Sequence, residues 1–369
     1  MQHGANTQGN NSSNHRYEQQ LAVWLLVCCA LVFAMVVLGG VTRLTGSGLS
    51  MVEWDPVFGI VPPLDQASWN TVFELYKQSP EYNKINIGMD LDGFKKIYWF
   101  EFAHRLLGRS IGIVFLVPFL FFLLTGRIAR SLIPKLVVMF VLGGLQGVLG
   151  WYMVMSGLID DPHVSPYRLT AHLVLAVIIY AFIFWTALDL LFRSAKHKPH
   201  AFPVRLRTAV DTLTGLVFIT ILSGGFVAGL KAGYAYNTFP LMDGQWVPEA
   251  ILMQEPVWRN FFENIATVQF DHRLLATLSF LGAVALWLLS LRHSLPVQVR
   301  IGLHCLLAAA TLQVALGIST LLLHVPVPLA AAHQGGALVL FTVLLFVSHR
   351  MRRQNVTQWI ADNRHTVSN

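Results

Sequence analysis

The sequence predicts an all-α integral membrane protein whose eight transmembrane helices form two tandem, pseudo-symmetric four-helix bundles. Composition is the first observation: 54% of the 369 residues are hydrophobic and only 12% are charged. Second, several uncharged runs reach the ~20 residues that a helix needs to cross a bilayer. Third, short motifs from the first half recur in the same order in the second half, which indicates one four-helix unit present twice.

The apolar runs place the helices near residues 21–42, 98–124, 134–158, 169–192, 211–230, 267–291, 301–323 and 328–349. The last two come from one stretch, Ile301 to His349, that carries no acidic residue, lysine or arginine. Pro326 and Pro328 divide that stretch, because proline removes a backbone hydrogen-bond donor and ends a helix. The chain therefore has eight predicted spans.

Basic residues gather in the loops after the second, fourth, sixth and eighth predicted helices. They are Arg127, Arg130 and Lys135; Arg193, Lys196, Lys198, Arg205 and Arg207; Arg292 and Arg300; and Arg350, Arg352 and Arg353. The positive-inside rule makes these loops and both termini cytoplasmic. The net charge of +7 therefore reflects topology, and no separate basic domain indicates nucleic-acid binding.

The predicted organisation has five parts. These are a cytoplasmic tail, a first bundle, a cytoplasmic linker, a second bundle and a second cytoplasmic tail, over residues 1–20, 21–192, 193–210, 211–349 and 350–369. A long outer loop at 45–97 is expected to be a lid over the first bundle or a partner-docking surface. No Ala-x-Ala site and no Arg- and Ser-rich transit segment accompany the first span, so we expect a retained helix in a bacterial inner membrane.

Four histidines lie at the outer starts of even-numbered helices, and their sequence contexts repeat. FAHRLL at 102–107 matches FDHRLL at 270–275, and LQGVLG at 145–150 matches LQVALG at 312–317. The histidines are His104, His172, His272 and His333. Each is expected within roughly the first two turns of its helix, so all four lie at similar depth toward the outer face.

A histidine inside a membrane helix is rare and normally faces the bundle interior with a partner. Neutral imidazole is a preferred axial ligand of haem iron, and two histidines at equal depth can approach one iron from opposite faces. The pattern predicts two haem sites, most economically His104 with His172 and His272 with His333. Glycine pairs at 39–40, 143–144, 224–225 and 335–336 would let a macrocycle approach closely, or serve ordinary helix packing.

One position distinguishes the two halves. Glu101 stands three residues before His104, whereas Gln269 stands three residues before His272. This spacing puts a carboxylate beside one iron site, where it could act as a general acid or base. The alternatives are a carboxylate favoured by the helix N-terminus, or an ion-pair partner of Arg105 or Lys96. A di-iron carboxylate site needs a Glu-x-x-His motif on each of two helices. The second half offers only Gln-x-x-His, so the sequence argues against such a site.

The chain resembles haem A synthase, the membrane enzyme that converts haem O to haem A for terminal oxidases. The resemblance covers nearly the whole chain. It is carried by VTRLTGSGLS at 41–50 leading to Trp54, by EFAHR at 101–105, by GYAYNTFPLMDG at 233–244 and by the frames around His272 and His333. No cysteine pair lies between Thr45 and Phe100, so the chain resembles the branch shared by proteobacteria and mitochondria.

The resemblance implies a catalytic Glu101 and a haem B cofactor held by His272 and His333. Haem O, the substrate, would lie between His104 and His172. An oxidoreductase reaction on a CH group would turn its methyl group into a formyl group through a hydroxylated intermediate, with water as the oxygen source. Candidate propionate partners on the outer side are Arg43, Arg105, Arg109, Arg168 and Arg273, of which we favour Arg105 and Arg273.

The implied partners follow from this reaction. They are haem O, haem O synthase, cytochrome oxidase assembly factors, the lipid bilayer, an unidentified electron acceptor and a second copy of the chain. The alternative function is a dihaem b-type electron-transfer cytochrome linked to quinol, which would hold two permanent haem B groups. A haem transporter is a third reading, but the predicted histidines lie toward one face rather than at the midplane.

Overall fold

The computed structural model describes residues 3–53, 59–159, 162–193 and 202–367, and these residues form helices without any strand. Eight of the helices are long and apolar enough to cross a membrane, as predicted. They are α1 (His3–Leu44), α4 (Leu91–Leu124), α5 (Ile133–Gly157), α6 (Pro166–Leu191), α7 (Val204–Gly229), α9 (Ile265–Ser290), α10 (Val297–Leu322) and α11 (Val327–Val367). Trp54, Lys196 and Lys198, which the sequence analysis used, lie outside the described residues.

Helix boundaries differ from the predicted ones because apolar runs mark only the part of a helix suited to a bilayer. Helix α4 begins at Leu91 rather than near residue 98, since the Asp90 side chain caps it by accepting from the Gly93 amide. Helix α11 likewise continues past residue 349 into a polar sequence. The polar flanks therefore extend several helices beyond their apolar segments.

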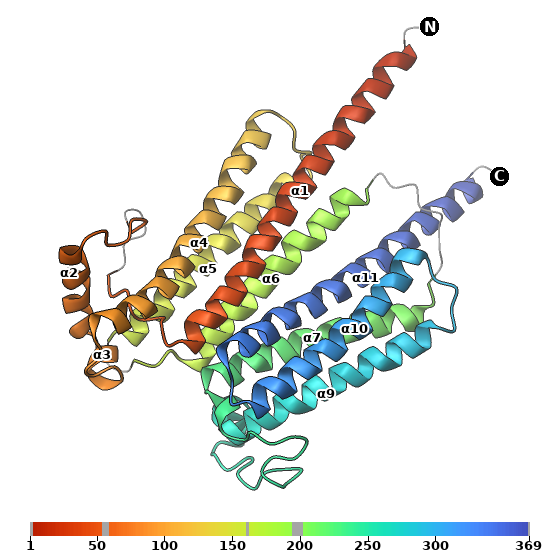
Figure 1. Ribbon diagram of the computed structural model, residues 1–369. Coiled ribbons are helices and arrows are strands. Elements are labelled where there is room, and N and C mark those ends of the chain that lie inside the picture. The colour runs from red at the N-terminus through yellow and green to blue at the C-terminus, as the bar shows by residue number, and fades with distance from the viewer. Residues whose placement is uncertain (1–2, 54–58, 160–161, 194–201, 368–369) are drawn as a thin grey trace.

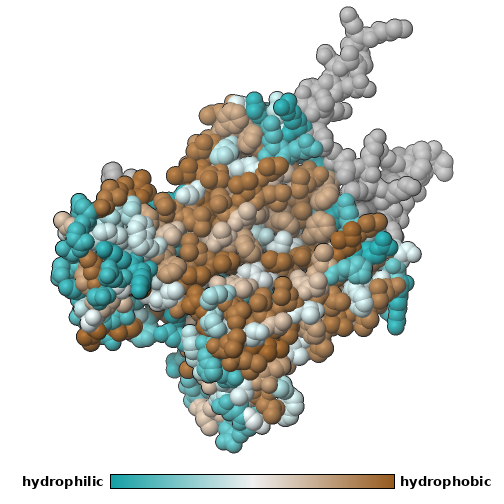
Figure 2. Space-filling view, in the orientation of Figure 1, coloured by the Kyte–Doolittle hydropathy of each residue, from teal (hydrophilic) through white to brown (hydrophobic). Residues whose placement is uncertain are grey.

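The long helices pack as two rings of four. Helices α1, α4, α5 and α6 form the first ring, and α7, α9, α10 and α11 form the second. The rings meet where α1 and α6 face α7 and α11. These contacts make α1, α6 and α11 the most buried spans, whereas α5 and α10 have the fewest buried residues. Figure 2 shows a broad apolar band across the long helices on the visible face.

Both chain ends lie at one end of the molecule, which we call the terminal end, and the long loops lie at the other, which we call the cap end (Figure 1). At the cap end, the loop after α1 folds into α2 (Gln66–Lys77) and α3 (Pro80–Lys84). The segment after α7 contains two 3-10 turns, η1 (Ala232–Tyr234) and η2 (Val257–Arg259), and α8 (Asn260–Glu263).

The folded part of the first loop, α2 and α3, packs against the start of α4 through aromatic side chains. We call this group the aromatic cluster: Trp69, Phe73, Tyr76, Phe94, Tyr98 and Phe102. The rings of Tyr76 and Phe94 stack with centroids 4.9 Å apart. Burial of such large rings stabilises the loop against the helix. The predicted lid or docking loop is thus a folded cap on the first ring.

Polar contacts also fix the two rings to each other. The Gln334 amide on α11 donates to the Val36 carbonyl on α1 at 2.8 Å, and the hydroxyls of Tyr180 and Thr342 lie 2.9 Å apart. At the cap end, the Arg43 guanidinium donates to the last carbonyls of α7, those of Ala228 and Gly229. These bonds hold the two rings in one register.

Candidate functional site

Each of the four predicted histidines packs against a glycine on the long helix that precedes it. A methyl group placed on the glycine would come within 2.8 to 3.2 Å of the imidazole Cε1 in every case. The pairs are Gly39 with His104, Gly150 with His172, Gly224 with His272 and Gly317 with His333. At Gly317 a methyl group would force His333 to move, and at the other three glycines it would press on the imidazole, so the glycines favour the observed ring positions.

The glycines also define a common depth. Each lies five to seven residues before the last residue of its helix, at the cap end. The prediction that every histidine lies in the first two turns holds for His172, His272 and His333 but is wrong for His104. His104 is thirteen residues into α4, because that helix begins early to carry the aromatic cluster.

Two of the predicted glycine pairs serve both functions that the sequence left open. Gly39 and Gly224 face the histidine of their own ring, whereas Gly40 faces Gln334 and Gly225 faces Thr170, each in the other ring. The first glycine of each pair thus shapes a histidine site and the second lets the rings pack. The pair at 143–144 has no neighbour within 4 Å of a methyl group placed there.

Two of the histidines, His272 and His333, lie close to each other inside the second ring. The rings of His272 and His333 have centroids 6.4 Å apart with an interplanar angle of 84°. Two metal–imidazole bonds of about 2 Å plus two ring radii of about 1 Å give about 6 Å. The pair therefore fits one iron between the two imidazoles, in a site built from α9 and α11.

Hydrogen bonds to the imidazole Nδ1 atoms separate the two pairs. Ser223 Oγ lies 2.8 Å from His272 Nδ1, and Gln313 Nε2 lies 3.1 Å from His333 Nδ1. The Nδ1 atoms of His104 and His172 are buried and have no hydrogen-bond partner among the described residues. Ser223 Oγ donates to the Thr220 carbonyl, so it can accept the Nδ1 proton of His272 and orient that ring with its other nitrogen free. Gln313 Nε2 is itself a donor, so it lies against the His333 ring without accepting a proton from it.

One histidine in each ring has its backbone carbonyl supported in the same way. Gln146 donates to the His172 carbonyl at 3.0 Å, and Gln313 donates to the His333 carbonyl at 2.9 Å. These glutamines are the second residues of the repeated frames that end at Gly150 and Gly317. The frames were visible in the sequence, but their roles depend on helix packing and were not predicted.

Glu101 lies beside the first pair and is almost fully buried, with 2% of its surface exposed. Its Oε2 accepts hydrogen bonds from Ser50 Oγ at 2.7 Å and from the Met51 amide at 2.8 Å. Its Oε1 accepts from Arg105. Of the sequence alternatives, the ion pair with Arg105 is present, but Glu101 lies ten residues into α4 and is no N-terminal carboxylate.

Gln269 occupies the matching place in the second ring but contacts the loop instead. Its amide donates to the Tyr236 carbonyl at 3.0 Å, and the Arg273 guanidinium donates to the same oxygen at 2.8 Å. Arg105 likewise donates to the Met51 carbonyl at 2.8 Å. Both arginines thus tie a loop to a helix at the cap end.

The Nε atoms of Arg43 and Arg273 are buried without a partner among the described residues.

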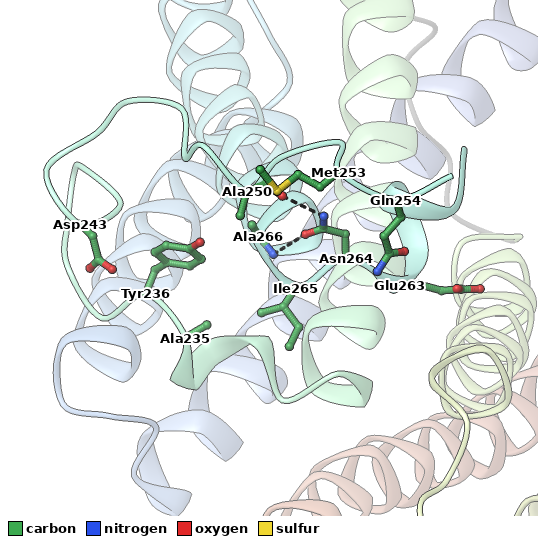
Figure 3. A pocket seen from close by; sticks show the side chains of 10 residues that line it. All are labelled: Ala235, Tyr236, Asp243, Ala250, Met253, Gln254, Glu263, Asn264, Ile265 and Ala266. Carbon is green, nitrogen blue, oxygen red and sulfur yellow. Dashed lines mark hydrogen bonds between the residues drawn. The ribbon is translucent and has the colours of Figure 1, made fainter. Parts of the chain in front are cut away.

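Two further features bear on the chemistry. Among the described residues, no group of three or more His, Cys, Asp or Glu side chains gathers as a metal site. An open pocket of about 550 Å³ lies in the segment after α7, between Tyr236 and Asp243 on one side and Glu263 on the other (Figure 3). None of the four histidines lines it.

Comparisons with known proteins identify the family of this chain. A family model described as cytochrome oxidase assembly protein matches residues 22–345. A heme A synthase of Nitrosospira multiformis is 56% identical over 338 residues, which cover 91% of this chain and 95% of the relative. A heme A synthase of Nitrosomonas eutropha is 51% identical over 95% of this chain and 100% of the relative. One from Arabidopsis thaliana is 46% identical over 91% of this chain and 75% of the relative.

Proposed function

This chain belongs to the cytochrome oxidase assembly protein family that includes the haem A synthases, and we propose that it is itself a haem A synthase. In this reaction a ring methyl group of haem O becomes the formyl group of haem A. The observation that carries the proposal is the duplicated histidine–glycine site with a buried carboxylate beside one copy only. A protein that held two equivalent permanent haems would have no need of that difference.

The first ring is the proposed substrate site, with His104 and His172 on either side of the haem O iron. Their Nδ1 atoms lack partners among the described residues, so these imidazoles are held less rigidly than those of the second ring. Looser ligands suit a haem that must enter, react and leave. Gly39 and Gly150 lie at similar depth in their helices, and each leaves room for the histidine it contacts. The imidazoles of His104 and His172 can therefore face one iron.

Glu101 is the proposed proton acceptor of the reaction. Each oxidation joins water oxygen to the substrate carbon and releases two protons and two electrons, first from methyl to hydroxymethyl. The second oxidation gives a hydrated aldehyde, which loses water to form the formyl group. Three donors, from Ser50, Met51 and Arg105, fix the carboxylate in one orientation. A carboxylate held this way can orient water and accept its proton.

The second ring is the proposed haem B site, held by His272 and His333. Haem B held there by the two histidines would supply one-electron transfer rather than oxygen chemistry. Ser223 and Gln313 position the two imidazoles, and the loop bonds of Gln269 and Arg273 hold the cap-end segment over them. This ring contributes no carboxylate equivalent to Glu101. A dihaem b-type cytochrome is therefore the less favoured function.

We further propose that the terminal end faces the cytoplasm of a bacterial inner membrane and the cap end faces outward. The described basic residues of the predicted cytoplasmic loops, such as Arg127, Arg193 and Arg300, support this orientation by the positive-inside rule. Arg105 and Arg273 remain the proposed propionate partners. Haem O synthase and oxidase assembly factors are the proposed protein partners, with an electron acceptor outside the chain.

Expression in membranes that make haem O but no haem A tests the proposal. We expect haem A to appear with this chain and the hydroxylated intermediate to accompany it, as extracted haems separated by chromatography show. Membranes that contain the folded chain and haem O but form neither product would contradict the proposed function.

A further inference from the structure

The segment that joins α7 to α9 exposes large apolar side chains at the cap end. We call residues 231–263 the outer segment, and it projects beyond the ends of the long helices in Figure 1. Its most exposed apolar side chains are Trp246 at 75%, Met253 at 70% and Trp258 at 55%. Exposed apolar surface of this extent marks an interaction surface.

Acidic residues lie among these apolar side chains. The outer segment carries four acidic residues and two basic ones: Asp243, Glu249, Glu255 and Glu263 against Lys231 and Arg259. Anionic lipid surfaces attract basic segments, so an acidic segment is poorly suited to them. A net negative surface instead attracts a positively charged protein and raises its rate of encounter. The charge therefore favours a basic protein partner over lipid headgroups.

The open pocket of about 550 Å³ in this segment has the chemistry to receive a cationic side chain. Asp243 and Glu263 line it from opposite sides, and Met253 adds an apolar surface (Figure 3). Carboxylates are strong hydrogen-bond acceptors for the ammonium of lysine and the guanidinium of arginine. An apolar patch beside a charged pocket is also the usual build of a protein interface.

Printed contacts join this pocket to the histidines of the second ring. Tyr236 lines the pocket, and its carbonyl accepts hydrogen bonds from Gln269 and Arg273. These two residues stand three positions before and one position after His272. Ala266 also lines the pocket and lies six residues before His272, about 9 Å along the axis of α9. The surface therefore lies over the proposed haem B site.

We propose that the outer segment docks a basic, one-electron carrier protein that accepts the electrons of the reaction. This inference rests on the proposed function, in which electrons leave the chain through the haem held by His272 and His333. Each two-electron oxidation reduces two carrier molecules by one electron each, and its two protons pass to water. Conversion of one haem O to haem A therefore reduces four carrier molecules.

The test uses the purified full chain with haem B bound and reduced beforehand with dithionite. Ferric mitochondrial cytochrome c is the basic carrier. The same cytochrome c with succinylated lysines has an acidic surface around the same redox centre. Stopped-flow absorption measures the second-order rate of cytochrome c reduction from about 10 to about 500 mM salt, a range over which surface charges become screened. The measurement requires no conversion of haem O.

Two pairs of substitutions separate the pocket from the rest of the cap end. Asp243→Asn with Glu263→Gln removes both pocket charges and keeps the side-chain shapes, and asparagine tolerates the φ of 50° at position 243. Asp92→Asn with Glu74→Gln is the matched control, because it removes two exposed charges next to the first ring. Trp258→Ala tests the apolar patch.

We expect the wild-type rate to fall at least tenfold from low to high salt, and succinylation to slow it at least tenfold at low salt. The pocket pair should slow it about tenfold at low salt with an unchanged haem spectrum. Trp258→Ala should slow it at every salt concentration. The control pair should stay within twofold of wild type.

The docking surface would be overturned by equal rates for native and succinylated cytochrome c, a comparison that needs no variant. Wild-type rates in the pocket pair would overturn it as well. Quenching of Trp246 and Trp258 fluorescence by brominated lipids, identified by its loss in their phenylalanine variants, would place the segment in the bilayer and also overturn it. Failure to convert haem O is a separate result, which contradicts only the proposed function.

Discussion

The two four-helix rings share one plan and differ at the places where a reaction would need them to differ. In each ring, two histidines pack against glycines near the cap end, and a glutamine donates a hydrogen bond to the backbone carbonyl of one of these histidines. The first ring adds a buried carboxylate, Glu101, and leaves its histidine Nδ1 atoms without partners among the described residues. The second ring has Gln269 and a serine on His272. One helical arrangement thus carries two histidine pairs in different polar surroundings.

The difference between His272 and His104 at Nδ1 comes from the residue that precedes the glycine each of them contacts. Ser223 precedes Gly224 on α7, and Leu38 precedes Gly39 at the matching position of α1. A serine can accept the Nδ1 proton of a ligand histidine and a leucine cannot. The comparison predicts that this pair of positions controls how firmly each haem is held.

The largest expected effect is that of Glu101→Gln, which makes the two rings alike at this position. We expect haem A formation to fall by about 10²- to 10⁴-fold, the usual contribution of a positioned general base. The matched control is Asp92→Asn, whose side chain is exposed on the same helix. Haem extraction from membranes measures both variants. A rate within twofold of wild type for Glu101→Gln would remove the carboxylate from the reaction.

The glycine contacts give the next largest effect. In Gly317→Ala, a methyl group 2.8 Å from His333 Cε1 should displace the imidazole, as happens when a core is overpacked. We expect the affinity for haem B to fall by up to about 100-fold, which lowers haem B occupancy. In the first ring, Gly150→Ala can be compared with Gly143→Ala on the same helix, where nothing lies within 4 Å. Absorption spectra of the purified variants report occupancy. Equal behaviour of the α5 pair would contradict the proposed histidine packing.

A smaller effect is expected at the serine. Ser223→Ala should loosen haem B about tenfold, because it removes the partner that orients His272. Leu38→Ser should tighten the first site and slow product release. Transfer of haem to an excess of a haem-binding protein measures both dissociation rates. If neither rate changes, Nδ1 hydrogen bonding does not distinguish the two rings.

The smallest expected effect is a change in the free energy of unfolding of the cap with pH. Burial raises the pKa of Glu81 on α3 from 4.5 to about 7, so the folded cap retains a proton that the unfolded segment loses at lower pH. Cap stability is therefore greatest on the acid side and falls on the order of 1 kcal/mol as pH rises through this window. Hydrogen exchange of the α2 amides should accelerate accordingly, beyond its intrinsic pH dependence. Glu81→Gln should flatten that change, and an unchanged profile would refute it.

The sequence predicted the features that repeat along one helix. The eight spans follow from apolar runs, and the Glu101 and Gln269 contrast follows from spacing to His104 and His272. It did not predict that Gly39 meets His104, because that contact depends on the register of two helices. The contact of Ser223 with His272 could not be predicted either, because it also joins two helices. Helix α4 began earlier than its apolar run because Asp90 caps a polar extension.

The cap was even less accessible to prediction. The loop could be recognised as long and aromatic, but Tyr76 and Glu81 meet through short helices that have too few residues to show a clear period. Ser50 and Met51 reach Glu101 from a turn whose geometry no local pattern reveals. Buried polar contacts between loops and helices required the folded structure.

The identity and ratio of the haems in the purified chain test the central claim most directly. After co-expression with a source of haem O, the haems are extracted, separated by chromatography and identified by mass spectrometry. The two-ring account predicts one firmly held haem B per chain together with haem O, its hydroxylated form or haem A. Two haem B per chain, with haem O left unconverted in the membrane, would contradict it and indicate an electron-transfer cytochrome.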